Sequence, residues 1–236
     1  SSDVCSSDLQ LDNLERFVYF STDEVFGPAP KGVNYGEYDR YNSSNPYSAT
    51  KAGGEELAVA FENTYKMPIY VTHTMNVFGE RQHPEKFIPM CIRKIRDEEK
   101  IFVHSDPSKT KAGSRFYINA KDVAEAMYFL LHLDSKQHDI IKDHMNAIGV
   151  RCPKFNVVGK EEIDNLSMVK IIAEAQKKEP VYEMVDFHTS RPGHDLRYSL
   201  DGAFMKKLGW EPRISLRDRL HEVTHWSLKN KEWIEL

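Results

Sequence analysis

Tyr47 and Lys51 are side chains that could move a proton between them and a substrate. They are four residues apart, at the start of a segment rich in Ala, Glu and Leu. On a helix, residues at this spacing lie on the same face. An ammonium beside a phenol favours the phenolate and lowers its pKa from the usual value of about 10, so Tyr47 could act as a base for an alcohol proton. The alternative is a surface tyrosine near a solvated lysine, because many helices contain such a pair.

Two adjacent carboxyl groups form a second candidate. Thr22, Asp23 and Glu24 follow residues 14–21, an apolar run that predicts a partly buried strand. In open parallel sheets, ligands bind at the carboxyl ends of the strands. Two carboxyl groups there can divide acid and base work if their environments hold their pKa values apart. The alternative is an acidic turn that faces water.

The elements that must position these groups alternate along the chain. The sequence predicts strands at 14–21, 68–75, 101–104, 116–118, 155–158 and 181–187. It predicts helices at 47–65, 87–96, 120–133, 166–177, 200–208 and 216–226. Residues 22–46 are predicted to be a functional loop, and residues 135–151 an irregular surface segment. Strands that alternate with helices predict βαβ units and a parallel sheet.

Composition excludes several classes of protein. The net charge is −4 and there is no long basic run, so we do not expect a nucleic-acid partner. Apolar runs such as 123–131 are too short to span a membrane, so we do not expect a membrane partner. The three cysteines, at positions 5, 91 and 152, are far apart, which predicts neither a disulfide framework nor a metal site and fits the cytoplasm.

Five segments, in order, resemble motifs of one enzyme family. They are STDEVFG, YSATKAGGEELAVAFENTY, THTMNVFGERQHPEKFIP, GSRFYINAKDVAEAM and RPGHDLRYSLD. Together they are similar to the extended short-chain dehydrogenases/reductases of the NAD-dependent epimerase/dehydratase family, and most of all to dTDP-glucose 4,6-dehydratase. Five ordered motifs are far more specific than any single one.

The resemblance implies an α/β fold, with a Rossmann-type doubly wound parallel sheet and a smaller C-terminal substrate domain. We expect residues 1–10 to be a non-native segment and residues 11–78 to be the later part of the NAD-binding domain. Residues 116–134 and 155–158 are expected to return to that domain, while 79–236 form mainly the substrate domain. Since the sequence has no GxGxxG or GxxGxxG loop, the first βαβ units are expected upstream, and the truncated chain itself is expected to bind NAD poorly.

The resemblance also assigns roles to individual residues. The catalytic residues it implies are Thr22, Asp23, Glu24, Tyr47 and Lys51. Those it places next to NAD are Ser21, Tyr47, Lys51 and Asn76. Those it places around the nucleotide-sugar substrate are Thr22, Asn76, Lys86, Phe87, Arg115, Asn156, Arg191 and His194.

The implied reaction is NAD-dependent dehydration of a nucleotide-linked hexose to a 4-keto-6-deoxy sugar nucleotide by internal hydride transfer. The triplet Thr22-Asp23-Glu24 favours this reaction, because related epimerases usually have a less acidic triplet. A nucleotide-sugar epimerase of the same family and a non-catalytic member that retained the fold remain alternatives. The nucleotide and the sugar stay open, since Val77 stands where many of these dehydratases have a second asparagine. The resemblance implies a cytoplasmic homodimer when the protein is full length.

Overall fold

The computed structural model describes residues 14–186 and 197–235, which divide into two compact units. The first unit consists of the chain up to Thr74 together with Glu125–Val157 and Ser199–Glu211. The second consists of Met75–Ala124, Val158–Tyr198 and Pro212–Leu236. Among the described residues, no helix has the length and apolarity needed to cross a membrane.

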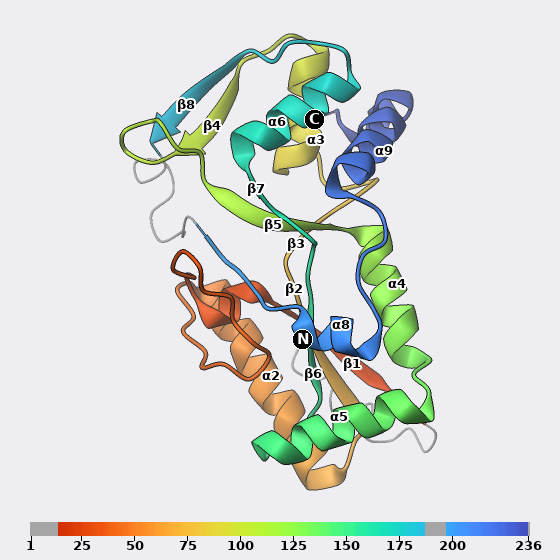
Figure 1. The fold of residues 1–236 in the computed structure, drawn as a ribbon. Helices are drawn as coiled ribbons and strands as arrows, with labels where there is room; N and C mark the ends of the chain where they lie inside the picture. Colours follow the sequence, from red (N-terminus) through yellow and green to blue (C-terminus); the bar gives the residue numbers. More distant parts are fainter. Residues whose placement is uncertain (1–13, 187–196, 236) are drawn as a thin grey trace. The chain divides into compact units, whose positions relative to one another are not determined.

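The first unit contains a parallel sheet of three strands. They are β1 (Phe17–Thr22), β2 (Ile69–Thr74) and β6 (Lys154–Val157), in the order β1-β2-β6 (Figure 1). Thr22 pairs with Thr74, which in turn pairs with Val157, so all three strands end at the same edge. This carboxyl edge is where a ligand of an open parallel sheet is expected.

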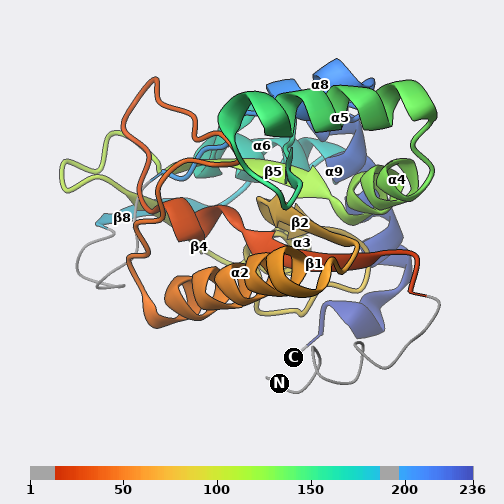
Figure 2. The same ribbon diagram turned by 90° about the horizontal axis from the view of Figure 1, so that it is seen from below.

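Helices cover both faces of this sheet. Figure 2 shows α2 (Pro46–Tyr65) on one side of β1 and β2, with α5 (Ser135–Ile148) and α8 (Ala203–Leu208) on the other. On the α8 side, the rings of Phe155 and Phe204 stack with their centroids 5.9 Å apart. Helices on both faces of a parallel sheet define the doubly wound α/β class, so the predicted fold class is confirmed.

The helix α2 has clear start and packing signals. Asn45 caps it by accepting a hydrogen bond from the Ser48 amide at 2.9 Å, and Pro46 occupies the first turn. A Cβ at Gly54 would lie 2.1 Å from the Tyr19 hydroxyl oxygen, whereas one at Gly53 would meet nothing within 4 Å. Gly54 therefore lets α2 approach β1 closely, while Gly53 has no such role.

The segment predicted to be irregular is instead the regular helix α5. Asp134 caps it in a reciprocal box with Gln137, and Gly149 ends it with a φ of 73°. Its buried face is narrow, because Ile141 is the one residue of α5 that is fully buried. The many polar residues of α5 face solvent, which is why hydrophobic periodicity did not reveal the helix.

The second unit has small sheets. Its strands are β3 (Asn76–Phe78), β4 (Ile101–Ser105), β5 (Ser114–Asn119), β7 (Glu162–Asp164) and β8 (Tyr182–Asp186). β3 and β7 flank β5, parallel and antiparallel respectively, while β4 pairs with β8. Their layout is visible in Figure 1.

Three helices of the second unit surround its main hydrophobic core. They are α3 (Phe87–Arg96), α6 (Asn165–Ala175) and α9 (Leu216–Lys229), followed by the short turn η2 (Lys231–Trp233). The core between them includes Ile92, Ile172 and Leu220, each fully buried. The helix α4 (Ala120–Leu131) contains one of the points where the chain passes from one unit to the other.

The observed division differs from the predicted domains in three segments. Residues 116–124, expected in the NAD-binding domain, belong to the second unit, and residues 135–154, expected in the substrate domain, belong to the first. The first change of unit falls after Thr74, close to the predicted boundary at 78. Residues 199–211, however, belong to the first unit, where the amides of Tyr35 and Asp201 bond the carbonyls of Ser199 and Tyr35 at 3.0 and 2.8 Å. An isolated bridge of this kind has no periodicity, so the sequence did not predict it.

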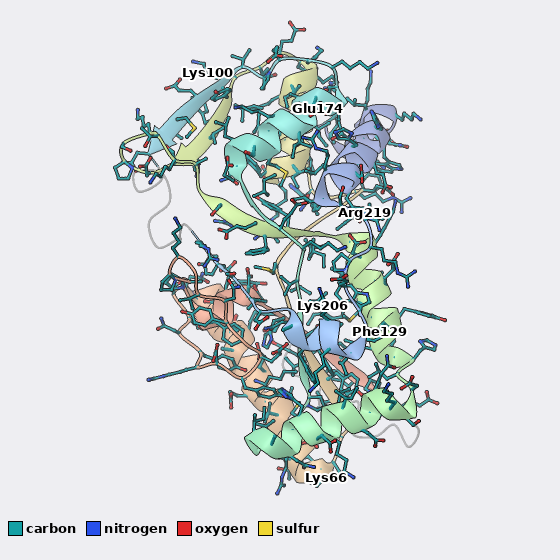
Figure 3. All side chains as sticks on the ribbon, in the orientation of Figure 1. Lys66, Lys100, Phe129, Glu174, Lys206 and Arg219 are labelled. Carbon is teal, nitrogen blue, oxygen red and sulfur yellow. The ribbon has the colours of Figure 1, made fainter. Side chains whose placement is uncertain are left out.

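A buried ion pair stabilises the second unit. Arg219, labelled on α9 in Figure 3, places its Nη2 2.6 Å from Asp122 Oδ1, with side chains 7% and 4% exposed. Arg219→Met is expected to lower the free energy of unfolding by about 3–5 kcal/mol, because it leaves a buried carboxylate without its partner. Urea unfolding measures the loss.

The matched control is Arg217→Met on the same helix. Arg217 pairs with Glu174, and both side chains are about half exposed. An exposed pair contributes about 1 kcal/mol or less, so this variant is expected to stay near the wild type. If both variants lost the same free energy of unfolding, the stabilising role of the buried Arg219–Asp122 pair would be contradicted.

Candidate active site

The acidic triplet lies where the carboxyl end of β1 turns into a short 3₁₀ helix, η1 (Asp23–Phe26). Thr22 caps this turn by accepting a hydrogen bond from the Glu24 amide at 3.4 Å, and its hydroxyl donates to Asp23 Oδ1 at 3.0 Å. Thr22 and Asp23 are buried, and Glu24 is half-buried. The turn therefore holds two carboxyl groups in different environments, as a division into acid and base requires.

Asn45 orients the Glu24 carboxylate, a role that the sequence did not suggest. Its side-chain amide donates to Glu24 Oε2 at 2.8 Å while its Oδ1 caps α2. One residue thus joins the start of α2 to the acidic triplet. The available signal was Asn45 directly before Pro46, which is typical of a helix N-cap.

Tyr47 and Lys51 lie on α2 beside this turn. The Tyr47 side chain is 55% exposed, and the Thr22 hydroxyl lies close enough to act on its pKa. The Lys51 ammonium donates to the backbone carbonyl of Phe20 on β1 and lies 4.8 Å from the centre of the Tyr19 ring. The structure therefore brings together both chemical candidates, the acidic triplet and the Tyr47–Lys51 pair.

The pKa of Tyr47 is shifted opposite to the expected direction. Burial raises it most, followed by the negative charges of Glu24 and Asp23, while the nearby Thr22 hydroxyl acts to lower it. The expectation that Lys51 would lower this pKa is wrong for this structure, because the Lys51 ammonium is directed to a carbonyl. The phenol thus lies among carboxyl groups, and a further positive charge beside it would favour the phenolate.

In the interior of the first unit, a buried carboxylate has several hydrogen-bonding and charged partners. Glu55 of α2 accepts hydrogen bonds from the hydroxyls of Ser21 and Tyr41. His73 Nε2 of β2 lies 3.0 Å from Glu55 Oε2, and the Lys154 ammonium lies 3.4 Å from the same oxygen. Nothing in the sequence distinguished Glu55, because it lies among other acidic and apolar residues of a helix.

Two predicted ligand contacts belong to this interior instead. Asn156 is fully buried, and its amide donates to the carbonyls of Tyr35 and Asp201 at 3.0 Å each, while its Oδ1 lies 2.9 Å from His73 Nδ1. Its polar atoms are occupied by protein, so it holds the edge of the sheet in place of the predicted substrate contact. Likewise the buried Ser21 hydroxyl donates its proton to Glu55.

In the second unit, two of the predicted residues contact each other. Asn76 donates to the carbonyl of Phe116 at 3.2 Å and faces Arg115 Nη1 at 3.5 Å. Both side chains are half-buried, which leaves part of each accessible. Lys86 is exposed at the start of α3, and Phe87 packs against the hydrophobic core of this unit.

The remaining predicted positions, Arg191 and His194, lie outside the described residues.

A family model decides the relationship of this chain to known proteins. The model for GDP-mannose 4,6 dehydratase matches residues 5–223. The chain belongs to this family. The GDP-mannose 4,6-dehydratase family is part of the NAD-dependent epimerase/dehydratase group that the five motifs resemble, so that prediction is confirmed.

Curated relatives of this family member include dehydratases. The dTDP-glucose 4,6-dehydratase of Escherichia coli is 31% identical over 237 residues, which is 92% of this chain and 60% of that protein. A trifunctional UDP-glucose 4,6-dehydratase, 3,5-epimerase and reductase of Arabidopsis thaliana is 33% identical over 93% of this chain and 30% of that protein. The chain thus spans 60% or less of the length of these two relatives.

Solved structures agree with the family assignment. The dTDP-glucose 4,6-dehydratase DesIV of Streptomyces venezuelae, crystallised with NAD and TYD, has a TM-score of 0.74 at 27% identity, covering 93% of this chain and 62% of that one. A UDP-glucuronic acid 4-epimerase of Bacillus cereus has a TM-score of 0.80 at 18% identity, covering 97% of this chain and 66% of that one, which shows a shared fold alone.

Proposed function

We propose that the protein carrying this chain dehydrates a nucleotide-linked hexose to a 4-keto-6-deoxy sugar nucleotide, with NAD as cofactor. The observation that carries the proposal is the convergence of Asp23, Glu24 and Tyr47 at the carboxyl edge of the first unit. Glu24 and Asp23 are close enough to Tyr47 to raise its pKa, and Thr22 is close enough to act on it in the opposite direction. The dTDP- and UDP-glucose 4,6-dehydratases among the relatives support the same reaction.

Each side chain has a role that fits its environment. Tyr47 takes the proton of the sugar 4-hydroxyl, which Thr22 also binds. Glu24, held by Asn45 at 2.8 Å and half-buried, removes the proton from C5. Asp23, which is buried, protonates the 6-hydroxyl so that water leaves. A proton transfer of this kind accelerates a reaction by about 10²–10⁴-fold.

The residues at this edge fit the nicotinamide half of NAD. Two carboxyl groups lie near Tyr47, and the Lys51 ammonium is hydrogen-bonded to a backbone carbonyl. The positively charged nicotinamide ring of NAD is therefore electrostatically favoured at this edge. Tyr47 and Lys51 would hold the nicotinamide ribose through their hydroxyl and ammonium groups. When bound, NAD supplies the reversible hydride acceptor that this dehydration needs between C4 and C6.

In the second unit, Arg115, Lys86 and Asn76 are proposed to bind the nucleotide end of the substrate. Arg115 suits a diphosphate, because a guanidinium forms paired, charge-assisted hydrogen bonds with phosphate oxygens. Asn76 supports Arg115 from β3 at 3.5 Å. The exposed Lys86 adds a second positive charge at the start of α3. Arg191 and His194 remain proposals for the same end of the substrate.

We also propose a cytoplasmic homodimer. The two cysteines of the described residues, Cys91 and Cys152, are buried and unpaired, which suits a reducing compartment. Along α2, Leu57 and Tyr65 are 43% and 60% exposed, and Gly53 has open space around it. An apolar helix surface of this kind supports contact with a second subunit.

The complete protein that carries these residues should be incubated with NAD and, separately, with dTDP-glucose, UDP-glucose, UDP-N-acetylglucosamine and GDP-mannose. We expect one of them to give a product lighter by one water, with the alkali-induced chromophore of a 4-keto sugar. Mass spectrometry follows the product and identifies the nucleotide. A product of unchanged mass and altered stereochemistry would overturn dehydration in favour of epimerisation.

A further inference from the structure

Two consecutive residues of β1 each bond a different residue of α2, and the next residue, Thr22, lies beside Tyr47 of the same helix. Tyr47, Lys51 and Glu55 are spaced four apart and so lie along one helix face. Lys51 donates to the Phe20 carbonyl and Glu55 accepts from the Ser21 hydroxyl. Thr22 lies close enough to Tyr47 to act on its pKa. These contacts set the position of the proposed base on α2 relative to the acidic triplet that follows β1.

Of these contacts, the hydrogen bond between Ser21 and Glu55 is buried and involves a charged acceptor. The Glu55 and His73 side chains are fully buried, and the Lys154 side chain is 9% exposed. Burial acts to raise the pKa of the Glu55 carboxyl, but the hydrogen bonds and charge of His73 and the hydroxyls of Ser21 and Tyr41 outweigh it and lower the pKa to about 2. Glu55 is therefore a carboxylate at neutral pH, and charge-assisted hydrogen bonds to it are short and strong.

The donors to Glu55 come from elements on every side of it. Ser21 lies on β1, Tyr41 on the loop before α2, His73 on β2 and Lys154 on β6. Glu55 thus ties α2 to the strands of the first unit at a point about 12 Å along the helix from Tyr47, at 1.5 Å per residue. The exposed contacts of Tyr47 and Lys51 have no comparable support.

We propose that Glu55, through Ser21, is a positioning residue that fixes the register of α2 on β1 and so places Tyr47 against Thr22, Asp23 and Glu24. The inference rests on the proposed function of these residues, but it concerns a side chain that touches neither substrate nor cofactor. Misplacing a reacting group by about 1 Å can cost on the order of 100-fold in rate. The register is therefore expected to affect kcat.

The test is Ser21→Ala in the complete protein, because it removes the link to β1 and leaves the Glu55 carboxylate with its other donors. We expect kcat to fall by about tenfold or more with KM within about twofold, as for misplacement of a reacting group. Ser21→Thr keeps the hydroxyl and is expected to restore most of the rate. Glu56→Gln, an exposed neighbour of Glu55 on the same helix, is the matched control and should match the wild type.

A second readout does not need turnover. In protein labelled with ¹³C at the tyrosine Cζ, the signal of Tyr47, assigned by its loss in Tyr47→Phe, is expected to shift in Ser21→Ala and to stay unchanged in Glu56→Gln. If the wild type dehydrates no sugar nucleotide but this shift occurs, the proposed function fails and the positioning role stands. An unshifted Tyr47 signal, or a loss in kcat that Ser21→Thr does not restore, would overturn the positioning role.

Discussion

Tyr47→Phe is expected to lower kcat for dehydration by about 10²–10⁴-fold, the range for a lost proton transfer. The substitution removes one oxygen, and the ring is 55% exposed, so packing should change little. The lost hydroxyl is the group whose pKa the neighbouring Glu24, Asp23 and Thr22 side chains act on. We expect substrate KM to change much less than kcat, because the phenol acts on the reacting 4-hydroxyl and not on the nucleotide.

Tyr65→Phe is the control for this variant. Tyr65 ends the same helix, is 60% exposed, and lies 18 residues from Tyr47. Steady-state kinetics of the two variants, with circular dichroism to compare their folding, separates loss of the base from loss of a surface hydroxyl. If Tyr47→Phe keeps more than about a tenth of the wild-type kcat, Tyr47 is not the general base, given the usual size of that contribution.

The sequence predicted the elements that carry the chemistry better than the interior that supports them. The helix expected at 47–65 is α2, and the strand expected at 68–75 is β2, because apolar periodicity and β-branched residues mark both. The acidic triplet was expected at the end of a strand and lies there. The helix α5 was not predicted, because most of its residues are polar and exposed, so the sequence shows no helical periodicity of apolar residues there.

The side-chain network below the site was not predictable for a different reason. Glu55, His73 and Lys154 come from α2, β2 and β6, and their contact depends on the order of those strands. The order of the motifs predicted that Asn156 binds the substrate. In the structure its side chain contacts His73 and the carbonyls of Tyr35 and Asp201, so its role is structural. The shift in the pKa of Tyr47 depends likewise on where the Lys51 ammonium points, which spacing alone does not determine.

Glu24→Gln is expected to stop exchange of the sugar C5 proton with solvent and to lower kcat by about 10²–10⁴-fold, as expected when a base is lost. The amide can still accept the hydrogen bond from Asn45 at the position of Glu24 Oε2, so the turn should be retained. The carboxylate that remains next to Tyr47 is then Asp23, which is buried and bonded by the Thr22 hydroxyl. Asp23 is proposed to act as the acid on the 6-hydroxyl, so it should not replace the missing base.

Deuterium incorporation at C5, followed by mass spectrometry in ²H₂O, measures this step directly. Wild-type protein should give a product that carries one solvent deuteron at C5, and Glu56→Gln should behave in the same way because its side chain is exposed on α2. If Glu24→Gln still exchanged C5 at the wild-type rate, the base would have to be another group at the edge of the sheet. The roles of Asp23 and Tyr47 would then have to be exchanged or shared, since both lie at the same edge of the sheet as Glu24.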